Sequence, residues 1–519
     1  MEKVKKKNIK GISGKKFVLV ILILAFIIRI SYLIFLRDTV FYDPYIMDKH
    51  DQKTFILWAE QILKHPFYVD GNVFYMAPFY PYFLAFLYLI TGGNLFAIYT
   101  IQILLDVFLC YLIYLLGTIL IDEKVGILSC FLCAFYKTFI VYSVSILSDS
   151  LISFLYIAFI TCIYIALKKP NFKWWIIAGI LLGFSALAKP TIGIFLPFLL
   201  VGLILYPEKN ITPLKISTLK QKIFVFFILV FISILVILPV TIRNWYVGKV
   251  FVPICSNGPE NWRIGNSSDS IGLFYYPKGK LLSPFSIDFW KLFIRKLNLF
   301  FVSYEWPQNM NIYLMNKLIP SLKFAFIRFG FIVPTGLFGL ILFSKDFKKN
   351  FLFLSFTLSN ILWVVLFFIT DRYRLPAVCC FTISAGYLIL WCINEVFKNK
   401  KILKPFLFII FISIFAYLFN YAPSELLPEE SKKIFGYLST KGIIKDLEAK
   451  EVNKAFKKAI DFLRILPDDP KSNFLMAIVY YEKGNRERTI DYLHKTLKLD
   501  PEFNPAKEFL ENLNKNGKF

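Results

Sequence analysis

Long apolar stretches separated by short polar segments run through the first 420 residues of the chain. A helix needs about 20 mainly apolar residues to cross a bilayer. We expect spanning helices near 17–36, 94–121, 125–143, 150–168, 173–188, 190–206, 222–242, 324–343, 351–370, 375–396 and 402–420. A further stretch, 78–90, is short and rich in proline and aromatic residues, so we expect it at the interface or against the bundle. The pattern predicts an all-α, multi-pass membrane bundle of about eleven helices.

The placement of lysine and arginine predicts the orientation of this bundle. The first 16 residues, MEKVKKKNIKGISGKK, are basic, which favours a cytoplasmic amino terminus. No small-residue cleavage site follows the first apolar stretch, so we expect an anchor, not a removed signal peptide. Alternation then leaves the loops 37–93 and 243–323 and the tail 421–519 outside. We therefore expect a bacterial cytoplasmic (inner) membrane protein with an extracytoplasmic C-terminal domain.

The tail, 421–519, differs from the membrane domain, 1–420, because its charges are mixed and its apolar residues follow a helical period. Pro467 and Pro501 each follow an amphipathic segment and lie 34 residues apart, which is the tetratricopeptide period. Ala477, Tyr480 and Gly484 fit the small, aromatic and turn positions of such a repeat. The alternatives are a tetratricopeptide-like domain and a generic helical hairpin, and either would bind a partner, not catalyse a reaction.

The composition excludes several classes of protein. Of 519 residues, 57% are hydrophobic and only 18% are charged, which excludes a soluble enzyme and a disordered chain. In a membrane protein, an excess of lysine and arginine usually lies in the cytoplasmic loops. The net charge of +25 is therefore no sign of a nucleic-acid partner, and we expect none. Cys130 and Cys133 have zinc-like spacing but no second pair and no nearby histidine. We expect no zinc site at these cysteines and no required cofactor. Asp48 and Asp51 could begin a divalent-metal site, but no third ligand in the sequence supports one.

Three charged residues inside apolar stretches need a structural or functional reason. Arg29 and Asp106 lie at similar depth in the first two predicted helices, so an ion pair between those helices would satisfy both. Lys137 either extends its ammonium to the interface or points into a cavity that holds an anionic head group.

The first long loop carries the candidate catalytic acids. Asp48 and Asp51 precede an amphipathic helix, so either could cap that helix. Alternatively, a carboxylate at the membrane surface could accept a proton from an attacking hydroxyl.

Cations gather beside these acids in the predicted topology. Lys189, Arg243, Arg372 and Arg374 all fall at the outer ends of predicted helices, where lysine and arginine should be scarce. They either anchor the interface or bind phosphate, for which arginine offers two parallel hydrogen bonds and lysine a point charge.

Several motifs, taken in order, resemble the polyprenyl-phosphate-sugar glycosyltransferases of the GT-C superfamily, in particular the dolichyl-phosphate-mannose–protein mannosyltransferase-like and aminoarabinose-transferase-like group. They are DQKTFILWAEQI with MAPFYPYFLAFLYLITG, ILSDSL, ALAKPT, RNWYVGKVFVPICSNGPENWRIGNSSDSIGLFYYP, YEWPQNMNIY and DRYRLP. The resemblance covers about residues 17–420.

The resemblance implies an enzyme that moves a sugar from a polyprenyl-phosphate donor to a hydroxyl of a protein, lipid or polysaccharide at the outer face of the membrane. On its pattern Asp51 takes the place of the catalytic base, with Asp48 as the alternative, because MDKHDQ lacks the aromatic that many relatives show after the acidic pair. Mannosyltransferase-like relatives need no metal, whereas oligosaccharyltransferases of similar fold use one. The tail would dock the acceptor or a protein partner. The implied substrate-binding residues are Arg243, Arg372, Arg374, Lys189, Asp149, Asn261, Asn266, Glu305 and Tyr373.

Two rival functions remain open from the sequence. One is an O-antigen ligase-like or polymerase-like transferase that uses a lipid diphosphate donor. The other is a transporter or flippase with a scaffold tail, although 17–420 shows no internal repeat of the kind that transporters carry.

Overall fold

A computed structural model describes residues 14–48, 50–67, 71–169, 171–207, 218–420 and 428–516. Across these residues the chain is helical, with isolated β-bridges in place of strands. The basic flank 1–13, the lysines at 209 and 215, and the start of the tail, 421–427, lie outside the described residues. The helices are α1 (Gly14–Leu36), α2 (Asp51–Lys64), α3 (Phe79–Thr91), α4 (Leu95–Leu120), α5 (Glu123–Ala134), α6 (Lys137–Ser143), α7 (Asp149–Lys168), α8 (Lys173–Ala188), α9 (Leu196–Leu205), α10 (Leu219–Gly248), α11 (Gly258–Asn266), α12 (Ile287–Phe301), α13 (Ile312–Leu318), α14 (Phe329–Phe343), α15 (Phe347–Leu366), α16 (Leu375–Phe397), α17 (Leu403–Leu418), α18 (Glu429–Glu448), α19 (Val452–Ile465), α20 (Pro470–Glu482), α21 (Arg486–Leu499) and α22 (Asn504–Asn516), with short 3-10 helices η1 (Pro44–Ile46), η3 (Pro190–Phe195), η5 (Pro320–Phe324), η6 (Ser344–Asp346) and η7 (Arg372–Arg374).

Every range predicted to span contains a helix, but 324–343 is a continuous helix only from Phe329 and 351–370 only to Leu366, and two further ranges are broken or irregular. The range 125–143 is broken between α5 and α6, and 190–206 begins as η3 because Pro190 follows the end of α8. Among the described residues, six helical stretches are long and apolar enough to cross a membrane by length and composition. The chain is therefore a multi-pass helical membrane protein, and the number of eleven crossings stays a prediction.

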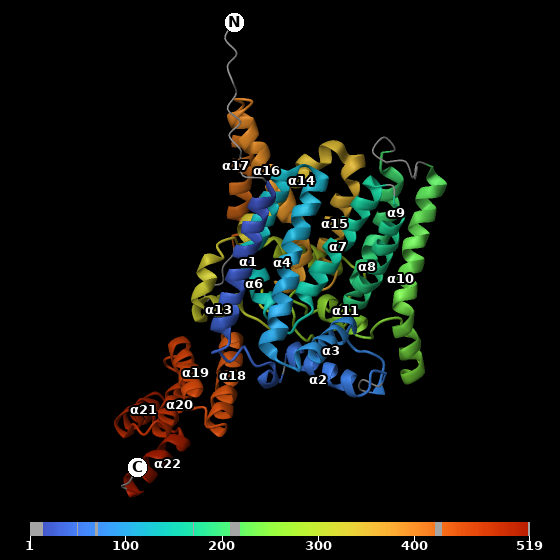
Figure 1. Ribbon diagram of the computed structural model, residues 1–519. Coiled ribbons are helices and arrows are strands. Elements are labelled where there is room, and N and C mark those ends of the chain that lie inside the picture. The colour runs from blue at the N-terminus through green and yellow to red at the C-terminus, as the bar shows by residue number, and fades with distance from the viewer. Residues whose placement is uncertain are drawn as a thin grey trace.

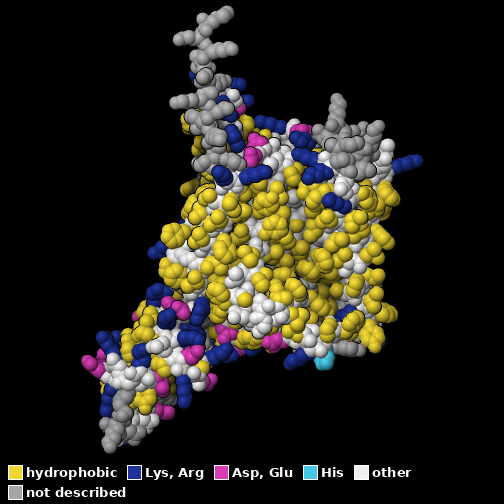
Figure 2. Space-filling model, viewed as in Figure 1, with side chains coloured by type: hydrophobic (Ala, Val, Ile, Leu, Met, Phe, Trp, Pro, Cys, Tyr) yellow, Lys and Arg dark blue, Asp and Glu magenta, His cyan; other side chains and the backbone are white. Residues whose placement is uncertain are grey.

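The helices form a bundle with one amino-terminal end and one opposite end that meets the C-terminal helices (Figure 1). Hydrophobic side chains make a broad band across the face that Figure 2 shows, and lysine and arginine gather at its amino-terminal rim. Close helix contacts need small residues: a Cβ added at Gly339 of α14 would lie 2.1 Å from the carbonyl oxygen of Ser384 in α16. Such small residues let helices approach without a hydrophobic drive between them.

The predicted ion pair inside the bundle is confirmed. The Arg29 guanidinium donates to Asp106 Oδ2 at 2.6 Å, and both side chains are buried. Arg29 also donates to the Ala134 carbonyl at 3.0 Å, so one side chain joins α1, α4 and the end of α5. Because an unpaired charge is costly in hydrocarbon, this pair fixes how the three helices pack.

The loop 37–93 folds into η1, α2 and α3 under the end of the bundle opposite the amino terminus (Figure 1). The segment 78–90 becomes α3 and packs on α2, as the Phe55 and Tyr80 rings show with centroids 5.0 Å apart. We call this end of the bundle the site end.

The tail forms helical pairs from α18 to α22 beyond the site end (Figure 1). Ala477 of α20 packs with Leu493 and Ala506, and Gly484 adopts a positive φ of 73° at the turn into α21. This is the pattern of stacked helical hairpins, and its assignment as a tetratricopeptide module stays a prediction. The boundary expected at 420/421 falls between α17 and α18.

The tail is docked on the first loop by charge and by packing. Lys457 pairs with Asp38 at 2.8 Å, and Lys445 pairs with Asp43. The rings of Phe41 and Phe435 stack with centroids 6.0 Å apart. The C-terminal helices therefore touch the segment that leads directly into α2.

Candidate active site

A cavity of about 350 Å³ lies at the site end, where the ends of several helices meet. Because helix ends and the loops between them meet here, side chains distant in sequence line one cavity. Six of the residues predicted from the sequence line it: Asp51, Asp149, Lys189, Asn261, Arg372 and Tyr373.

Asp51 is the first residue of α2, and its carboxylate turns away from the helix backbone. Its Oδ2 accepts hydrogen bonds from Arg372 Nη2 at 2.7 Å and from Asn309 Nδ2 at 2.9 Å. The helix cap is His50, whose side chain makes no capping hydrogen bond, so the alternative that an aspartate caps α2 is wrong. Among the described residues no donor bonds to Oδ1, which leaves that oxygen for a group in the cavity.

The surroundings of Asp51 favour its ionised form. Burial by itself raises the pKa of the carboxyl, but the Arg372 guanidinium and the hydrogen bonds from Arg372 and Asn309 outweigh it. The pKa of Asp51 therefore lies below its ordinary value. The group is a carboxylate, ready to accept a proton, at any pH near neutrality.

Arg372 is the electrostatic centre of the cavity. Its guanidinium lies between two carboxylates, with Nη2 at 2.7 Å from Asp51 and Nη1 at 3.5 Å from Asp149 Oδ2. Its Nε donates to Gln308 Oε1 at 3.2 Å. Asp149 is the buried first residue of α7, so the guanidinium is held on two rigid helix ends.

Lys189 is a second cation, between α8 and η3. Its Nζ lies 3.5 Å from the centroid of the Tyr373 ring and 4.8 Å from that of Trp363. Among the described residues it makes no ion pair with a carboxylate, so its charge is available to an anion. Aromatic faces stabilise such a cation without neutralising it.

The rest of the lining divides into a polar and an apolar part. Asn257 and Asn261 contribute amides from the start of α11, whereas Trp363, Phe367 and Phe368 form an aromatic wall. A ligand with a polar head and an apolar tail matches this division.

Asp48, the alternative catalytic residue, faces the C-terminal helices and does not line the cavity. Its Oδ2 accepts from the Tyr437 hydroxyl at 3.0 Å, and the carboxylate pairs with Lys53 and Lys441. The structure thus separates the two acids: Asp51 faces Arg372, and Asp48 joins the first loop to α18.

Two arginines predicted to bind substrate donate instead to backbone carbonyl oxygens. Arg243 donates to the carbonyl oxygens of Phe67 and Asn72 and lies over the Phe74 ring, with its guanidinium carbon 4.0 Å from the centroid. Arg374 donates to the carbonyls of three residues before α13: Phe300, Val302 and Tyr304. Neither lines the cavity.

Asn266 and Glu305 are likewise buried in hydrogen-bond networks outside the cavity. Asn266 accepts from Lys296 Nζ at 2.9 Å, and that ammonium also bonds to the carbonyls that end α15. Glu305 accepts from the hydroxyls of Tyr136 and Thr138. Burial raises the pKa of Glu305, and the neighbouring Arg374 lowers it by less.

Three residues of the site had no role assigned from the sequence. Asn309 holds Asp51 from a left-handed backbone conformation, with φ at 64°, and Gln308 holds Arg372. Asn309 lies in the YEWPQNMNIY motif, which pointed to this loop but not to this contact. Trp363 lies in an apolar stretch that gives no sign of a binding role.

Among the described residues no group of three or more His, Cys, Asp and Glu side chains is arranged to hold a metal. Asp51 and Asp149 are both oriented toward Arg372, whose guanidinium occupies the place between them.

Part of the chain matches a known protein family. Residues 75–242 match the family described as dolichyl-phosphate-mannose-protein mannosyltransferase. No curated protein sequence matches the chain. The matched segment contains Asp149 and Lys189, whereas Asp51 and Arg372 lie outside it.

Solved structures of the Archaeoglobus fulgidus oligosaccharyltransferase are similar at low identity. The apo form has 14% identity and a TM-score of 0.49, over 82% of this chain and 58% of that one. A form tethered to an acceptor peptide has 13% identity and a TM-score of 0.47, over 85% and 59%. A complex with an inhibitory peptide and a dolichol-phosphate has 14% identity and a TM-score of 0.43, over 82% and 58%. The chain thus spans a little under three fifths of that enzyme's length, and its similarity to the mannosyltransferase family extends over α3 to α10.

Proposed function

We propose that the chain is a membrane glycosyltransferase that moves a sugar from a polyprenyl-phosphate donor to an acceptor hydroxyl. One observation carries the proposal: a carboxylate, a guanidinium and an ammonium with no ion pair among the described residues converge on one cavity that also has an aromatic wall. The match of residues 75–242 to a dolichyl-phosphate-mannose family supports the donor class. A lipid donor also explains why the site lies on a membrane bundle, because the polyprenol chain needs an apolar surface beside the site.

The donor would bind with its phosphate at Lys189 and Arg372 and its polyprenol along the aromatic wall. Lys189 would supply the main charge because it has no ion pair among the described residues, whereas Arg372 already has two carboxylate neighbours. Burial of the phosphate in this cavity strengthens both contacts, because the local dielectric is low.

Transfer would follow a direct displacement at the anomeric carbon. The acceptor oxygen forms the new bond to that carbon as its bond to the phosphate oxygen breaks. The proton of the acceptor hydroxyl passes to Asp51 Oδ1, and polyprenyl phosphate leaves with its charge held by Lys189 and Arg372. An in-line attack of this kind inverts the anomeric centre.

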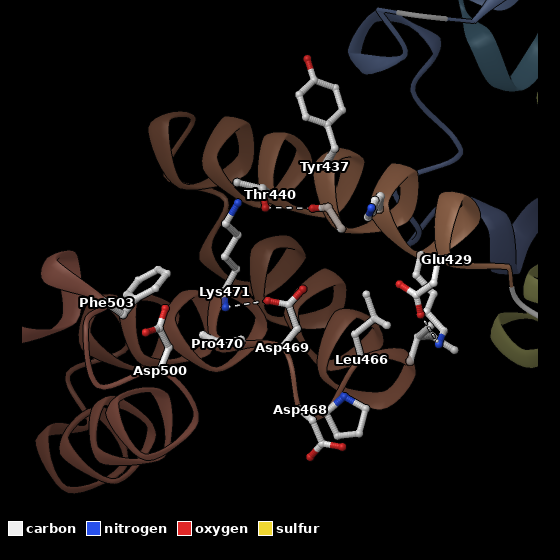
Figure 3. Close-up of a pocket in the computed structure, with 15 residues that line it drawn as sticks. Glu429, Tyr437, Thr440, Leu466, Asp468, Asp469, Pro470, Lys471, Asp500 and Phe503 are labelled. Carbon is white, nitrogen blue, oxygen red and sulfur yellow. Dashed lines mark hydrogen bonds and ion pairs between the residues drawn. The ribbon is translucent and has the colours of Figure 1, made fainter.

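The acceptor would be brought to the site end by the C-terminal helices. A groove of about 850 Å³ lies between α18 and the segments that precede α20 and α22 (Figure 3). Acidic residues, among them Asp468 and Asp500, and basic residues, among them Lys433 and Lys471, line it together. Such mixed charge suits a polar polymer, and Tyr437 on the same helix bonds to Asp48 in the first loop.

The proposal is tested with purified full-length protein in lipid nanodiscs and synthetic short-chain donors. We expect release of polyprenyl phosphate from a monophosphate sugar donor, and no release by the Asp51→Asn variant. Turnover of only the diphosphate donor would favour the ligase-like rival. Movement of intact donor between leaflets without any sugar transfer would favour the transporter and overturn the proposal.

A further inference from the structure

Four cations form a patch on a flank of the bundle that shares no residue with the cavity. Lys137 begins α6, Lys317 lies in α13, Lys323 lies in η5, and Arg328 precedes α14. Among the described residues none of the four makes an ion pair with a carboxylate. The sequence between 306 and 345 contains no aspartate or glutamate, so this segment adds cations to the surface without adding acids.

Backbone contacts hold the two ends of the patch together. Ile327 N donates to the Phe135 carbonyl at 3.3 Å, and Lys137 N donates to the Ile327 carbonyl at 3.2 Å. This parallel bridge joins Tyr136 to Ile327, so the next residues along, Lys137 and Arg328, lie side by side. The break between α5 and α6, which the sequence did not predict, exists where this bridge forms.

Lys137 has few partners for a buried ammonium. Its side chain is 9% exposed, and its Nζ donates to Asn316 Oδ1 at 2.8 Å. An ammonium has three donors, and no other acceptor among the described residues bonds to it. The neighbour of Asn316 in the chain is Lys317, which brings a third cation to the region where α13 packs against α6.

Exposed aromatic rings surround these charges. Phe324 is 70% exposed, Phe326 57% and Phe331 47%. Phe326 also packs on Phe131 and Phe135, with ring centroids 6.0 and 5.3 Å apart. Figure 2 shows lysine and arginine side chains on the left edge of the hydrophobic band, at the height where Figure 1 places α13. Cations framed by lipid-facing rings need an anion that is available at the membrane boundary.

We propose that this patch, made of Lys137, Lys317, Lys323 and Arg328, binds the phosphate head group of an anionic membrane lipid. The phosphate would complete the hydrogen bonds of Lys137 and neutralise the neighbouring cations, and the acyl chains would lie against the exposed phenylalanines. The proposal does not depend on the enzymatic function, because no residue of the patch lines the cavity.

The test is lipid binding by the purified full-length protein, measured by native mass spectrometry with phosphatidylglycerol and phosphatidylcholine. Each cation near a lipid surface contributes about fivefold in affinity, so the triple variant Lys317→Gln/Lys323→Gln/Arg328→Gln should bind phosphatidylglycerol about one hundredfold more weakly. These three side chains are exposed, so the variant should fold. Lys137→Gln alone should weaken binding about fivefold.

The matched control is Lys278→Gln/Lys280→Gln/Lys291→Gln, which removes three exposed cations from the loop before and the start of α12. It should bind phosphatidylglycerol as tightly as the wild type. Equal binding by the triple variant and the wild type would overturn the proposal, as would an equal loss in the control. Full competition by inorganic phosphate at the same concentration as the lipid would also overturn it, because the site would then hold a free anion.

Discussion

Replacing Asp51 by Asn removes the proposed base while keeping the shape of the side chain. The amide cannot accept the proton of an acceptor hydroxyl, and the ion pair with Arg372, 2.7 Å in the structure, is lost. Arg372 keeps Asp149 and Gln308 as partners, so the guanidinium should stay in place. The variant therefore isolates the base from the rest of the cavity.

The expected loss follows from the role. General base catalysis contributes about 10²–10⁴-fold in rate, which is about 3–5 kcal/mol of activation free energy. The lost ion pair adds little to global stability, because the Asp51 side chain is 35% exposed and Arg372 has other partners. We thus expect kcat to fall at least one hundredfold with donor affinity changed by no more than about threefold. The assay is release of polyprenyl phosphate at saturating and limiting donor.

The pH profile checks the same group independently. The pKa of Asp51 is lowered by Arg372 despite burial, so the base loses its charge only when pH falls below the range in which an ordinary aspartate titrates. Between pH 5 and 7 the rate should not fall because of this group. Asp48→Asn is the matched control, and it should keep activity within about fivefold. An Asp51→Asn variant that retains more than a tenth of the wild-type kcat would refute the role. A wild-type acid limb near pH 6 that this variant removes would contradict the lowered pKa of Asp51.

Three further predictions concern the cations. Lys189→Gln should lower kcat/KM for the donor by about 10–100-fold through KM, because a charged hydrogen bond to phosphate contributes about 1.5–3 kcal/mol; an unchanged KM would contradict the phosphate role. Lys441→Glu should weaken docking of the C-terminal helices by placing a like charge beside Asp48, and adding Asp48→Lys should restore it, as measured by limited proteolysis of the junction; a double variant no better than the single one would count against this contact. Lys296→Met should lower the free energy of unfolding by about 2–4 kcal/mol, since it leaves the buried carbonyls of Gly265 and Phe367 without their ammonium donor; a thermal unfolding midpoint equal to the wild type would show that water or relaxation replaces it.

Most of the helical architecture could be predicted because hydropathy alone requires it. Apolar length fixes where helices lie, and the depth of Arg29 and Asp106 along their helices was enough to pair them correctly. The break between α5 and α6 could not be predicted, because it depends on a bridge to Ile327, a contact almost 200 residues away in sequence.

The site was predictable only in part, because residue type and topology do not say what a side chain touches. Asp51, Lys189 and Arg372 do share a cavity, as their positions at helix ends suggested. Arg243 and Arg374 were also predicted to bind substrate from their positions near helix ends. Both instead donate hydrogen bonds to backbone carbonyl oxygens. Asp48 and Asp51 are only three residues apart, yet Asp48 bonds to Tyr437 of the C-terminal domain and Asp51 bonds to Arg372 of the membrane domain. Only the three-dimensional partners separate binding arginines from structural ones.

The central claim is that one cavity at the site end holds the phosphate of a lipid donor between Lys189 and Arg372, with Asp51 beside the sugar. A cryo-electron microscopy map of the full-length protein with a polyprenyl-phosphonate analogue of the donor tests this most directly. The account predicts density for the phosphonate within hydrogen-bond distance of both cations and for the polyprenol along Trp363 and Phe368. Density for the head group on another surface, with the cavity unchanged, would contradict it.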